Sequence, residues 1–198
     1  MMNHKLYDVL FGVNNLPDEL KDVKKREALM EIIDENLLLS RRHKNELLLT
    51  PGNVSDQIFF LESGAARGFL YDDMGDEKLL YMWDEHQVIC DCSSYFFAKP
   101  SNMFIQLTQD STLLSLTRSN IAQITEKYPY VEIAINVILL NDIEYNRTRV
   151  IDFMTLTPAA RYQKLLQIMP KADQKFSQRD IASYTGTTRQ TIYRSKKA

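Results

Sequence analysis

Apolar residues recur at helical spacing in the first part of the chain. Residues 17–39 place Val23 and Met30 near one face and the cationic run 24–26 on the other. This pattern predicts an amphipathic helix over 17–39. The charged residues 41–44 that follow are expected to form a solvated turn.

From residue 46 to residue 116 the apolar segments become short and alternate with turn signals. Segments 66–71 and 78–83 flank a loop in which Gly75 can adopt a positive φ, which predicts a β-hairpin. Further strands are expected at 47–49, 57–62, 104–107 and 113–116. Many short strands with such punctuation are typical of a β-sandwich or barrel.

A long helix is predicted after this β-rich part. Pro129 suits a first helical turn, and neither Pro nor Gly occurs again until Pro158. Apolar residues then step by three, four or seven, at Ile133, Val137, Leu140, Ile143, Val150 and Met154. The stripe can be covered wholly within the chain, or partly by a second copy in a short coiled coil, and we favour the homodimer.

The segment 177–194 has the pattern of two short helices joined by a tight turn. Ser177 is a suitable N-cap with Asp180 three residues on, and Gly186 stands where the turn needs a left-handed residue. Ala182, Gly186 four residues later and Ile192 six further match the helix-turn-helix spacing. Thr185 and Thr187 flank the glycine at sites that are often apolar, so we expect a weakly packed small core.

Several exposed side chains of this segment suit a DNA contact. Arg bonds the O6 and N7 atoms of guanine in bidentate fashion, and Gln does the same with N6 and N7 of adenine. The candidate DNA-binding residues are Ser177, Gln178, Thr188, Arg189, Gln190, Thr191, Tyr193, Arg194 and Lys196. The alternative is a structural helical hairpin whose polar residues are only solvated.

The charge distribution supports a polyanionic partner. Residues 158–198 carry nine basic and two acidic residues, a net charge of +7, whereas residues 1–157 carry a net charge of −9. A basic C-terminal segment on an otherwise acidic chain is typical of nucleic-acid binding. The alternative is a solvated basic tail without a specific partner, which would have the same net charge.

The whole chain resembles the Crp/Fnr family of bacterial transcription regulators. The resemblance covers about 37–197 and rests on Pro51-Gly52, on 58–64 with Arg67, on the hairpin loop 72–77, on 106–116 and on 177–194. It implies an α+β fold with an N-terminal double-stranded β-helix (jelly roll) like that of cyclic-nucleotide-binding domains, a long dimerisation helix and a C-terminal helix-turn-helix of the winged-helix type. The implied domains are 1–125, 126–155 and 156–198. The implied partners are double-stranded DNA, a second copy of the chain and RNA polymerase, together with an unknown small-molecule effector.

The resemblance fails where cyclic AMP would bind. Cyclic-AMP-binding members carry a Gly-Glu pair and then an Arg for the phosphate, but residues 88–103 contain none of these, and no Arg lies between Arg67 and Arg118. A buried phosphate would lack its bidentate cation, so cyclic AMP is not expected as the ligand. The candidate effector-pocket residues are Arg67, Asp91, Ser93, Ser101 and Asn102.

The sequence argues against an enzyme, a metal centre or a cofactor. Its three His are scattered, and its two Cys, Cys90 and Cys92, are too few for an iron–sulfur cluster. At strand spacing the two Cys would point to the same face, where packing is the expected role. His86 is a conceivable haem ligand, but a lone His is usually a surface or hydrogen-bonded residue, and haem is not expected. No Gly-rich phosphate loop or nucleophile elbow occurs.

The expected location is the cytoplasm, without a membrane partner. The chain has no secretory signal, no disulfide framework and no apolar run near 20 residues. The printed sequence ends at Ala198, before the usual β-wing, so the wing is expected to be missing, either by nature or by truncation. This leaves one alternative function, a sensor or dimerisation module whose helix-turn-helix no longer reads DNA.

Overall fold

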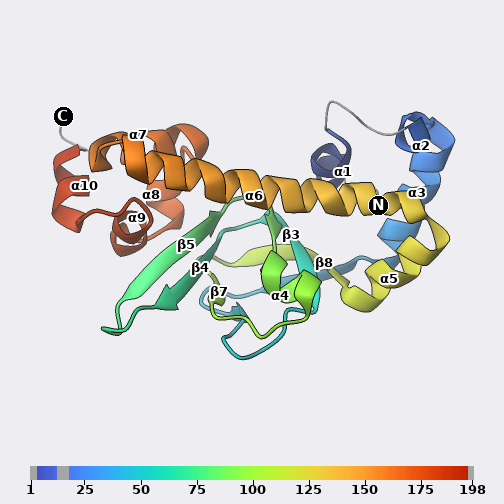
Figure 1. Ribbon diagram of the computed structural model, residues 1–198, viewed down its shortest axis with the longest axis horizontal. Coiled ribbons are helices and arrows are strands. Elements are labelled where there is room, and N and C mark those ends of the chain that lie inside the picture. Colours follow the sequence, from blue (N-terminus) through green and yellow to red (C-terminus); the bar gives the residue numbers. More distant parts are fainter. Residues whose placement is uncertain (1–3, 13–17, 196–198) are drawn as a thin grey trace.

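A computed structural model describes residues 4–12 and 18–195 of the chain. A β-roll lies under one long helix, α6, which runs along the length of the molecule (Figure 1). Short N-terminal helices lie at one end of α6, and the C-terminal helices lie at the other end. Among the described residues, no helix combines the length and the apolarity that crossing a bilayer requires.

The N-terminal helices are α1 (His4–Phe11), α2 (Asp18–Lys21) and α3 (Val23–Asn36). The Asp22 side chain accepts from the backbone N–H groups of Lys24 and Lys25 and so begins α3, which buries Leu29 and Ile33. The single helix predicted over 17–39 is therefore two helices, separated at Asp22, and the second of them ends at Asn36.

Strand β1 (Leu38–Arg42) follows α3 directly and pairs antiparallel with strand β8. The prediction that residues 41–44 form a solvated turn is wrong for Arg41 and Arg42, because both pair with β8 at Thr112 and Ser111. Most side chains of β1 are exposed, so burial does not explain why this segment is a strand. Backbone pairing with a segment some 70 residues away along the chain stabilises it.

Two four-stranded antiparallel sheets form the roll, in the orders β1-β8-β3-β6 and β2-β7-β4-β5. The remaining strands are β2 (Leu47–Leu49), β3 (Gln57–Ser63), β4 (Ala66–Tyr71), β5 (Glu77–Trp83), β6 (Val88–Ile89), β7 (Phe104–Leu107) and β8 (Ser111–Thr117). The β4–β5 hairpin is confirmed, and Gly75 in its loop has φ +79°.

Apolar side chains fill the interior of the roll. Leu61, Ile89, Leu107 and Leu113 are fully buried there, and each contributes about 1.5–3 kcal/mol relative to exposure. Trp83 belongs to the same cluster and packs so closely on Gly68 that a Cβ there would lie 2.9 Å from its ring. The ring of Trp83 thus takes up room inside the roll.

Helix α4 (Cys92–Phe97) lies between β6 and β7. The expectation that Cys90 and Cys92 share one face of a strand is wrong, because Cys90 follows β6 and Cys92 is the first residue of α4. Asp91 between them is the N-cap of this helix and accepts from the backbone N–H of Ser94. Both Cys are free thiols, and Cys90 is buried.

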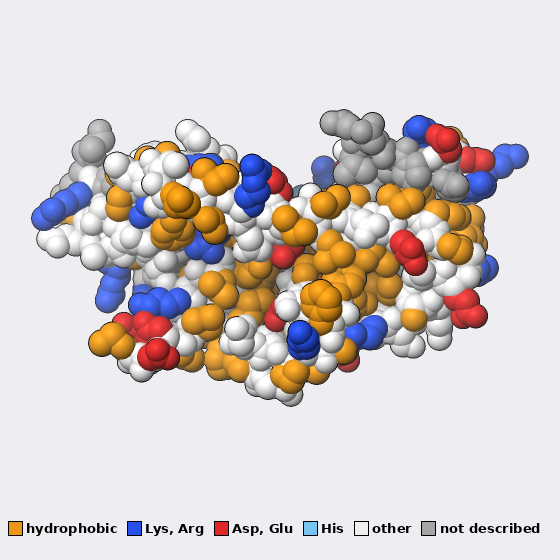
Figure 2. Space-filling model, in the orientation of Figure 1, with side chains coloured by type: hydrophobic (Ala, Val, Ile, Leu, Met, Phe, Trp, Pro, Cys, Tyr) orange, Lys and Arg blue, Asp and Glu red, His pale blue; other side chains and the backbone are white. Residues whose placement is uncertain are grey.

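The long helix begins after helix α5 (Arg118–Lys127) and the 3₁₀ turn η1 (Pro129–Val131), and α6 itself spans Glu132–Thr155. Within the predicted stripe, Val137 is buried, but Leu140, Ile143, Val150 and Met154 are 59–80% exposed. Hydrophobic side chains accordingly recur along the line of α6 in Figure 2.

The C-terminal helices are α7 (Pro158–Ile168), α8 (Ala172–Lys175), α9 (Gln178–Tyr184) and α10 (Arg189–Ser195). Thr157 caps α7 through the N–H of Ala160, and Ser177 and Asp180 form the predicted capping box of α9. Gly186 has φ +61°, and a Cβ there would lie 2.4 Å from Cε1 of Phe153 on α6. The turn therefore excludes a side chain for two independent reasons.

Candidate nucleic-acid interface

Helix α10 lies at the far end of the molecule from α5 (Figure 1). Ile192 is fully buried and anchors the helix, and Thr188 begins it by accepting from the N–H of Thr191 at 3.2 Å. The exposed residues are Thr188, Arg189, Gln190, Tyr193 and Arg194, and Thr191 is half-buried. The predicted reading face is thus turned outward.

The other predicted contacts lie at the start of α9. Ser177 and Gln178 are exposed, although the Ser177 hydroxyl is engaged with the Asp180 carboxylate at 2.7 Å. Arg179, which the sequence reasoning left out, is also exposed in this first turn; its position next to Gln178 was the available signal. Lys196 lies outside the described residues.

The helix-turn-helix does not stand apart from the roll, because the two share one apolar core. Phe69, Leu79 and Met82 of strands β4 and β5 pack in the same cluster as Ile181 and Ile192 of α9 and α10. Tyr162, Leu165, Met169 and Phe176 complete the C-terminal side of this cluster. Thr185 is fully buried within the turn and donates to the carbonyl of Ile181 at 2.7 Å, so its hydroxyl is satisfied.

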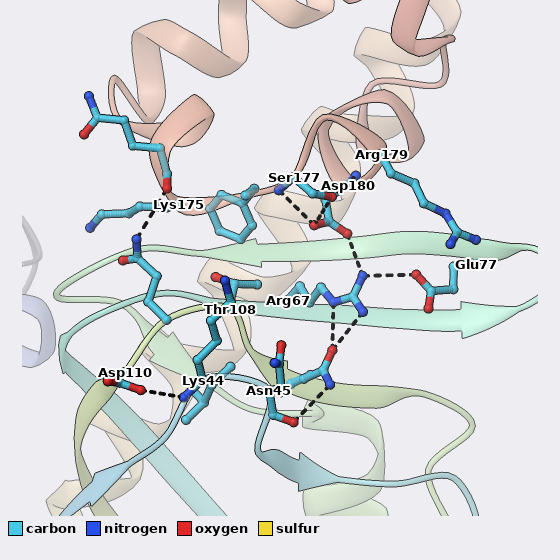
Figure 3. A pocket seen from close by; sticks show the side chains of 15 residues that line it. Lys44, Asn45, Arg67, Glu77, Thr108, Asp110, Lys175, Ser177, Arg179 and Asp180 are labelled. Atoms are coloured by element: carbon cyan, nitrogen blue, oxygen red, sulfur yellow. Dashed lines mark hydrogen bonds and ion pairs between the residues drawn. The ribbon is translucent and has the colours of Figure 1, made fainter.

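An ion pair crosses this junction. Arg67 on β4 donates to Asp180 of α9 at 2.6 Å and to Glu77 of β5 at 3.1 Å, and its side chain is 16% exposed while that of Asp180 is 8% exposed. Two further bonds, at 2.8 and 3.1 Å, hold the guanidinium on the Gln106 amide oxygen. Figure 3 shows Arg67 pointing out of the sheet toward α9.

A second cation crosses the junction from the opposite direction. The Lys175 ammonium of α8 is bonded to Asp84 and, at 2.8 Å, to Glu85 in the turn after β5. Burial opposes its charge, but the bonds to the two carboxylates outweigh burial and raise the pKa of Lys175. In return, the bond from Lys175 lowers the pKa of Glu85.

The central helix joins the same junction. Arg149 of α6 donates to the carbonyl of Leu80 on β5 and, at 3.1 Å, to that of Tyr184 on α9, and its guanidinium lies 4.2 Å from the centre of the Tyr184 ring. The Ser183 hydroxyl accepts from the N–H of Leu79 at 2.9 Å. Roll, α6 and α9 are therefore linked by directional contacts that define one orientation.

A cleft of about 860 Å³ remains beside this junction, between the roll and α8–α9. Lys44, Arg67, Lys175 and Arg179 line it, with the carboxylates Glu77, Asp110 and Asp180 (Figure 3). Because Arg67 and Lys175 are each paired with two carboxylates, the cleft offers little net positive charge to an anion.

The five predicted effector-pocket residues do not come together. The Arg67 guanidinium faces the helix-turn-helix, whereas Asp91 caps α4 and accepts from the Ser101 hydroxyl at 2.7 Å. Ser93 and Asn102 are exposed. The structure therefore brings Asp91 and Ser101 together, whereas the carboxylate partners of Arg67 hold it on the outer face of the sheet.

No group of three or more His, Cys, Asp or Glu in the described part of the chain has an arrangement that could hold a metal ion.

Comparison with known proteins identifies the architecture. No protein-family model and no curated protein matches the chain. Among solved structures, FixK2 from Bradyrhizobium japonicum is similar with a TM-score of 0.70 and 15% identity, over 81% of this chain and 83% of FixK2. The c-di-GMP-responsive global regulator CLP from Xanthomonas campestris gives a TM-score of 0.66 and 14% identity, over 86% of this chain and 90% of CLP. A regulator from Eubacterium rectale that is assigned to the Crp/Fnr family gives a TM-score of 0.65 and 17% identity, over 86% of this chain and 81% of that regulator.

The chain has the Crp/Fnr fold. The expected jelly roll, long helix and C-terminal helix-turn-helix are confirmed, as is the resemblance read from the sequence. Identities below 20% establish the fold, and the arguments about function depend on this chain's own residues.

The ion pair between β4 and α9 makes a testable prediction. Arg67→Met keeps an apolar stem but leaves Asp180 and Glu77 without their buried cation. We expect the free energy of unfolding to fall by about 3 kcal/mol, as for other broken buried pairs. Urea denaturation followed by circular dichroism measures this loss.

A double-mutant cycle isolates the pair. In an Asp180→Asn background, Arg67→Met should cost at least about 1 kcal/mol less than in the wild type. The exposed neighbour Arg179→Met is the matched control and should change stability by less than about 0.5 kcal/mol. A coupling energy near zero would show that the contact between Arg67 and Asp180 does not stabilise the junction.

Proposed function

We propose that this chain is a homodimeric, sequence-specific DNA-binding transcription regulator of the Crp/Fnr type. The observation that carries the proposal is the outward face of α10, on which Arg189, Gln190 and Arg194 are exposed around the buried anchor Ile192. As a regulator it acts in the cytoplasm, with RNA polymerase as a further partner and without a catalytic activity of its own.

The chemistry of this face suits the major groove. Arg189 and Gln190 are adjacent in the first turn of α10, the part of a recognition helix that meets base edges. Their bidentate donors and acceptors match guanine and adenine, while Thr188 and the cations of Arg194 and Arg179 suit phosphate oxygens.

The exposed side of α6 supports a dimer. Leu140, Ile143, Val150 and Met154 leave an apolar surface that a monomer would hold in water, and an equivalent helix of a second copy would bury it. A two-fold assembly of this kind places two copies of α10 in successive major grooves, about 34 Å apart.

Two features favour a ligand other than cyclic AMP. The interior of the roll is packed with apolar side chains around Trp83, and the one Arg that approaches the roll from β4 is committed to Asp180 and Glu77 outside it. A phosphate inside the roll would lie among apolar side chains and would lack the cation that its burial requires.

Substitutions on α10 test the DNA reading. Arg189→Ala or Gln190→Ala should relax the preference at one base pair of each half-site, at a cost of about 1–3 kcal/mol for the preferred base. Selection from random duplexes, followed by titration of the enriched site at several salt concentrations, measures both the preference and the phosphate contribution.

The control for this experiment is Lys127→Ala, which removes an exposed cation at the opposite end of the molecule and should change neither preference nor affinity. If wild-type protein enriches no motif, the alternative of a helix-turn-helix that no longer reads DNA is the correct one.

A charge on the α6 stripe tests the dimer. Ile143→Asp should convert the protein from dimer to monomer at micromolar concentration, because a carboxylate would be buried in an apolar interface. Sedimentation velocity gives the mass, with Phe97→Asp on α4, where the aromatic is 69% exposed, as the matched control. A monomeric wild type, or an Ile143→Asp protein that remains dimeric, would contradict an interface along this stripe.

A further inference from the structure

The exposed side of α6 has a seven-residue repeat. Five exposed residues lie along it, separated alternately by three and four positions: Leu140, Ile143, Arg147, Val150 and Met154. This is the spacing of the a and d positions of a coiled coil. Leu140, Arg147 and Met154 then occupy a positions, while Ile143 and Val150 occupy d positions, and together they form one seam along the helix.

The opposite side of α6 is held by the chain itself. Three residues there also recur every seven positions, at Ile138, Tyr145 and Asp152. Ile138 packs against the cluster of the N-terminal helices, and the Tyr145 hydroxyl accepts from the backbone N–H of Met82 on β5 at 3.4 Å. Asp152 accepts from Lys164 of α7 at 2.7 Å. These contacts fix the rotation of α6 about its axis and turn the seam away from the rest of the chain.

A charged residue stands in the middle of this otherwise apolar seam. Arg147 has Ile143 before it and Val150 after it, and its Nη1 atom donates to the two carboxylate oxygens of Glu144 at 3.3 and 3.2 Å. Glu144 is at the e position, which borders the seam. The side chains of Arg147 and Glu144 are 65% and 63% exposed, so both charges are hydrated while α6 is uncovered.

This cation restricts what can cover the seam. An apolar surface laid on α6 would bury the Arg147 guanidinium against hydrocarbon, and a buried charge needs a counter-charge within reach. A second α6 that lies parallel and in register supplies it. The level of Arg147 then holds two guanidiniums and two Glu144 carboxylates, between apolar layers formed by Ile143 and Val150.

Other alignments of two α6 helices do not provide this match. A slip of one heptad places Arg147 opposite Leu140 or Met154. In an antiparallel pair the a positions of one helix face the d positions of the other, and both d positions of this seam are apolar. Either alignment therefore buries the guanidinium against apolar side chains.

We propose that Arg147 and Glu144 form a polar layer that fixes two copies of α6 in a parallel, in-register alignment and limits the assembly to two chains. The inference deepens the proposed homodimer and rests on it. A single polar residue at an a position specifies register and oligomeric state in coiled coils, at a cost in stability.

Three variants measure the layer through the dissociation constant of the dimer. Glu144→Gln leaves two facing guanidiniums without their carboxylates and should raise this constant about tenfold or more. Arg147→Leu replaces the cation by an apolar residue and should lower the constant. The combined variant should associate at least as tightly as the wild type, because it has no cation left to pair. Sedimentation equilibrium gives the constants, and circular dichroism shows that each variant is folded.

The matched control is Asp18→Asn. Asp18 forms an exposed ion pair of the same i,i+3 kind, with Lys21 on α2, and its loss should leave the dissociation constant unchanged within a factor of two. An unchanged constant in Glu144→Gln, or an equal loss in Glu144→Gln and the combined variant, would overturn the polar layer.

Disulfide cross-linking measures the alignment. In a Cys90→Ala, Cys92→Ala background, Val150→Cys gives each chain one thiol, one layer from Arg147. In-register helices bring the two thiols opposite one another, whereas a slip of seven residues moves them about 10 Å apart, beyond the reach of a disulfide. With oxidised glutathione as the oxidant, the protein that keeps Arg147 should cross-link fully into dimers.

Adding Arg147→Leu to this protein should reduce the cross-linked fraction, and sedimentation should show species larger than a dimer. Undiminished cross-linking in a strictly dimeric Arg147→Leu protein would overturn the role of Arg147 in alignment.

Failure of the proposed dimer gives a different result. A monomeric wild type refutes the dimer together with the layer, and a wild-type dimer that tolerates Ile143→Asp has its interface elsewhere. A dimer that Ile143→Asp dissociates but that is insensitive to Glu144→Gln refutes the polar layer alone.

Discussion

The contact between Arg67 and Asp180 is the constraint on which the arrangement of the molecule depends. A buried carboxylate without a cation is costly, and Asp180 already serves the cap of α9 through Ser177. The helix that opens the helix-turn-helix is thereby tied, at its first turn, to the outer face of strand β4. Because the apolar core on either side of this pair is shared, the roll and the C-terminal helices adopt one orientation.

That orientation decides which surfaces are left for partners. With α9 against β5 and Ile192 in the shared core, the polar side of α10 is turned away from the roll. The apolar side of α6 is left uncovered along Leu140, Ile143 and Val150, while Tyr145 and Arg149 on the same helix contact β5. One helix therefore carries the uncovered apolar surface and also helps to position the helix-turn-helix.

Local chemistry allowed much of this to be predicted from the sequence. The caps at Thr157 and Ser177, the left-handed glycine Gly186 and the β4–β5 hairpin depend on neighbours within a few residues, and all of them are confirmed. Strand β1 depends on pairing with β8, which lies far along the chain, and the charged residues Arg41 and Arg42 on their own are typical of a turn.

The surroundings of Arg67 could not be predicted from the sequence for the same reason. The partner of Arg67 is 113 residues away, and nothing near Arg67 in the sequence indicates that the side chain faces outward. Asp91 is different, since Asp is itself a preferred N-cap residue, and the strand spacing assumed for the two Cys obscured this role.

Hydroxyl-radical footprinting of wild-type protein on its selected duplex tests the central claim most directly. If α10 faces outward on a two-fold assembly, two protected tracts should appear on one face of the duplex, centred one helical turn or about 34 Å apart, over a near-palindromic sequence. A single protected tract, or protection that does not follow the selected sequence, would contradict the account.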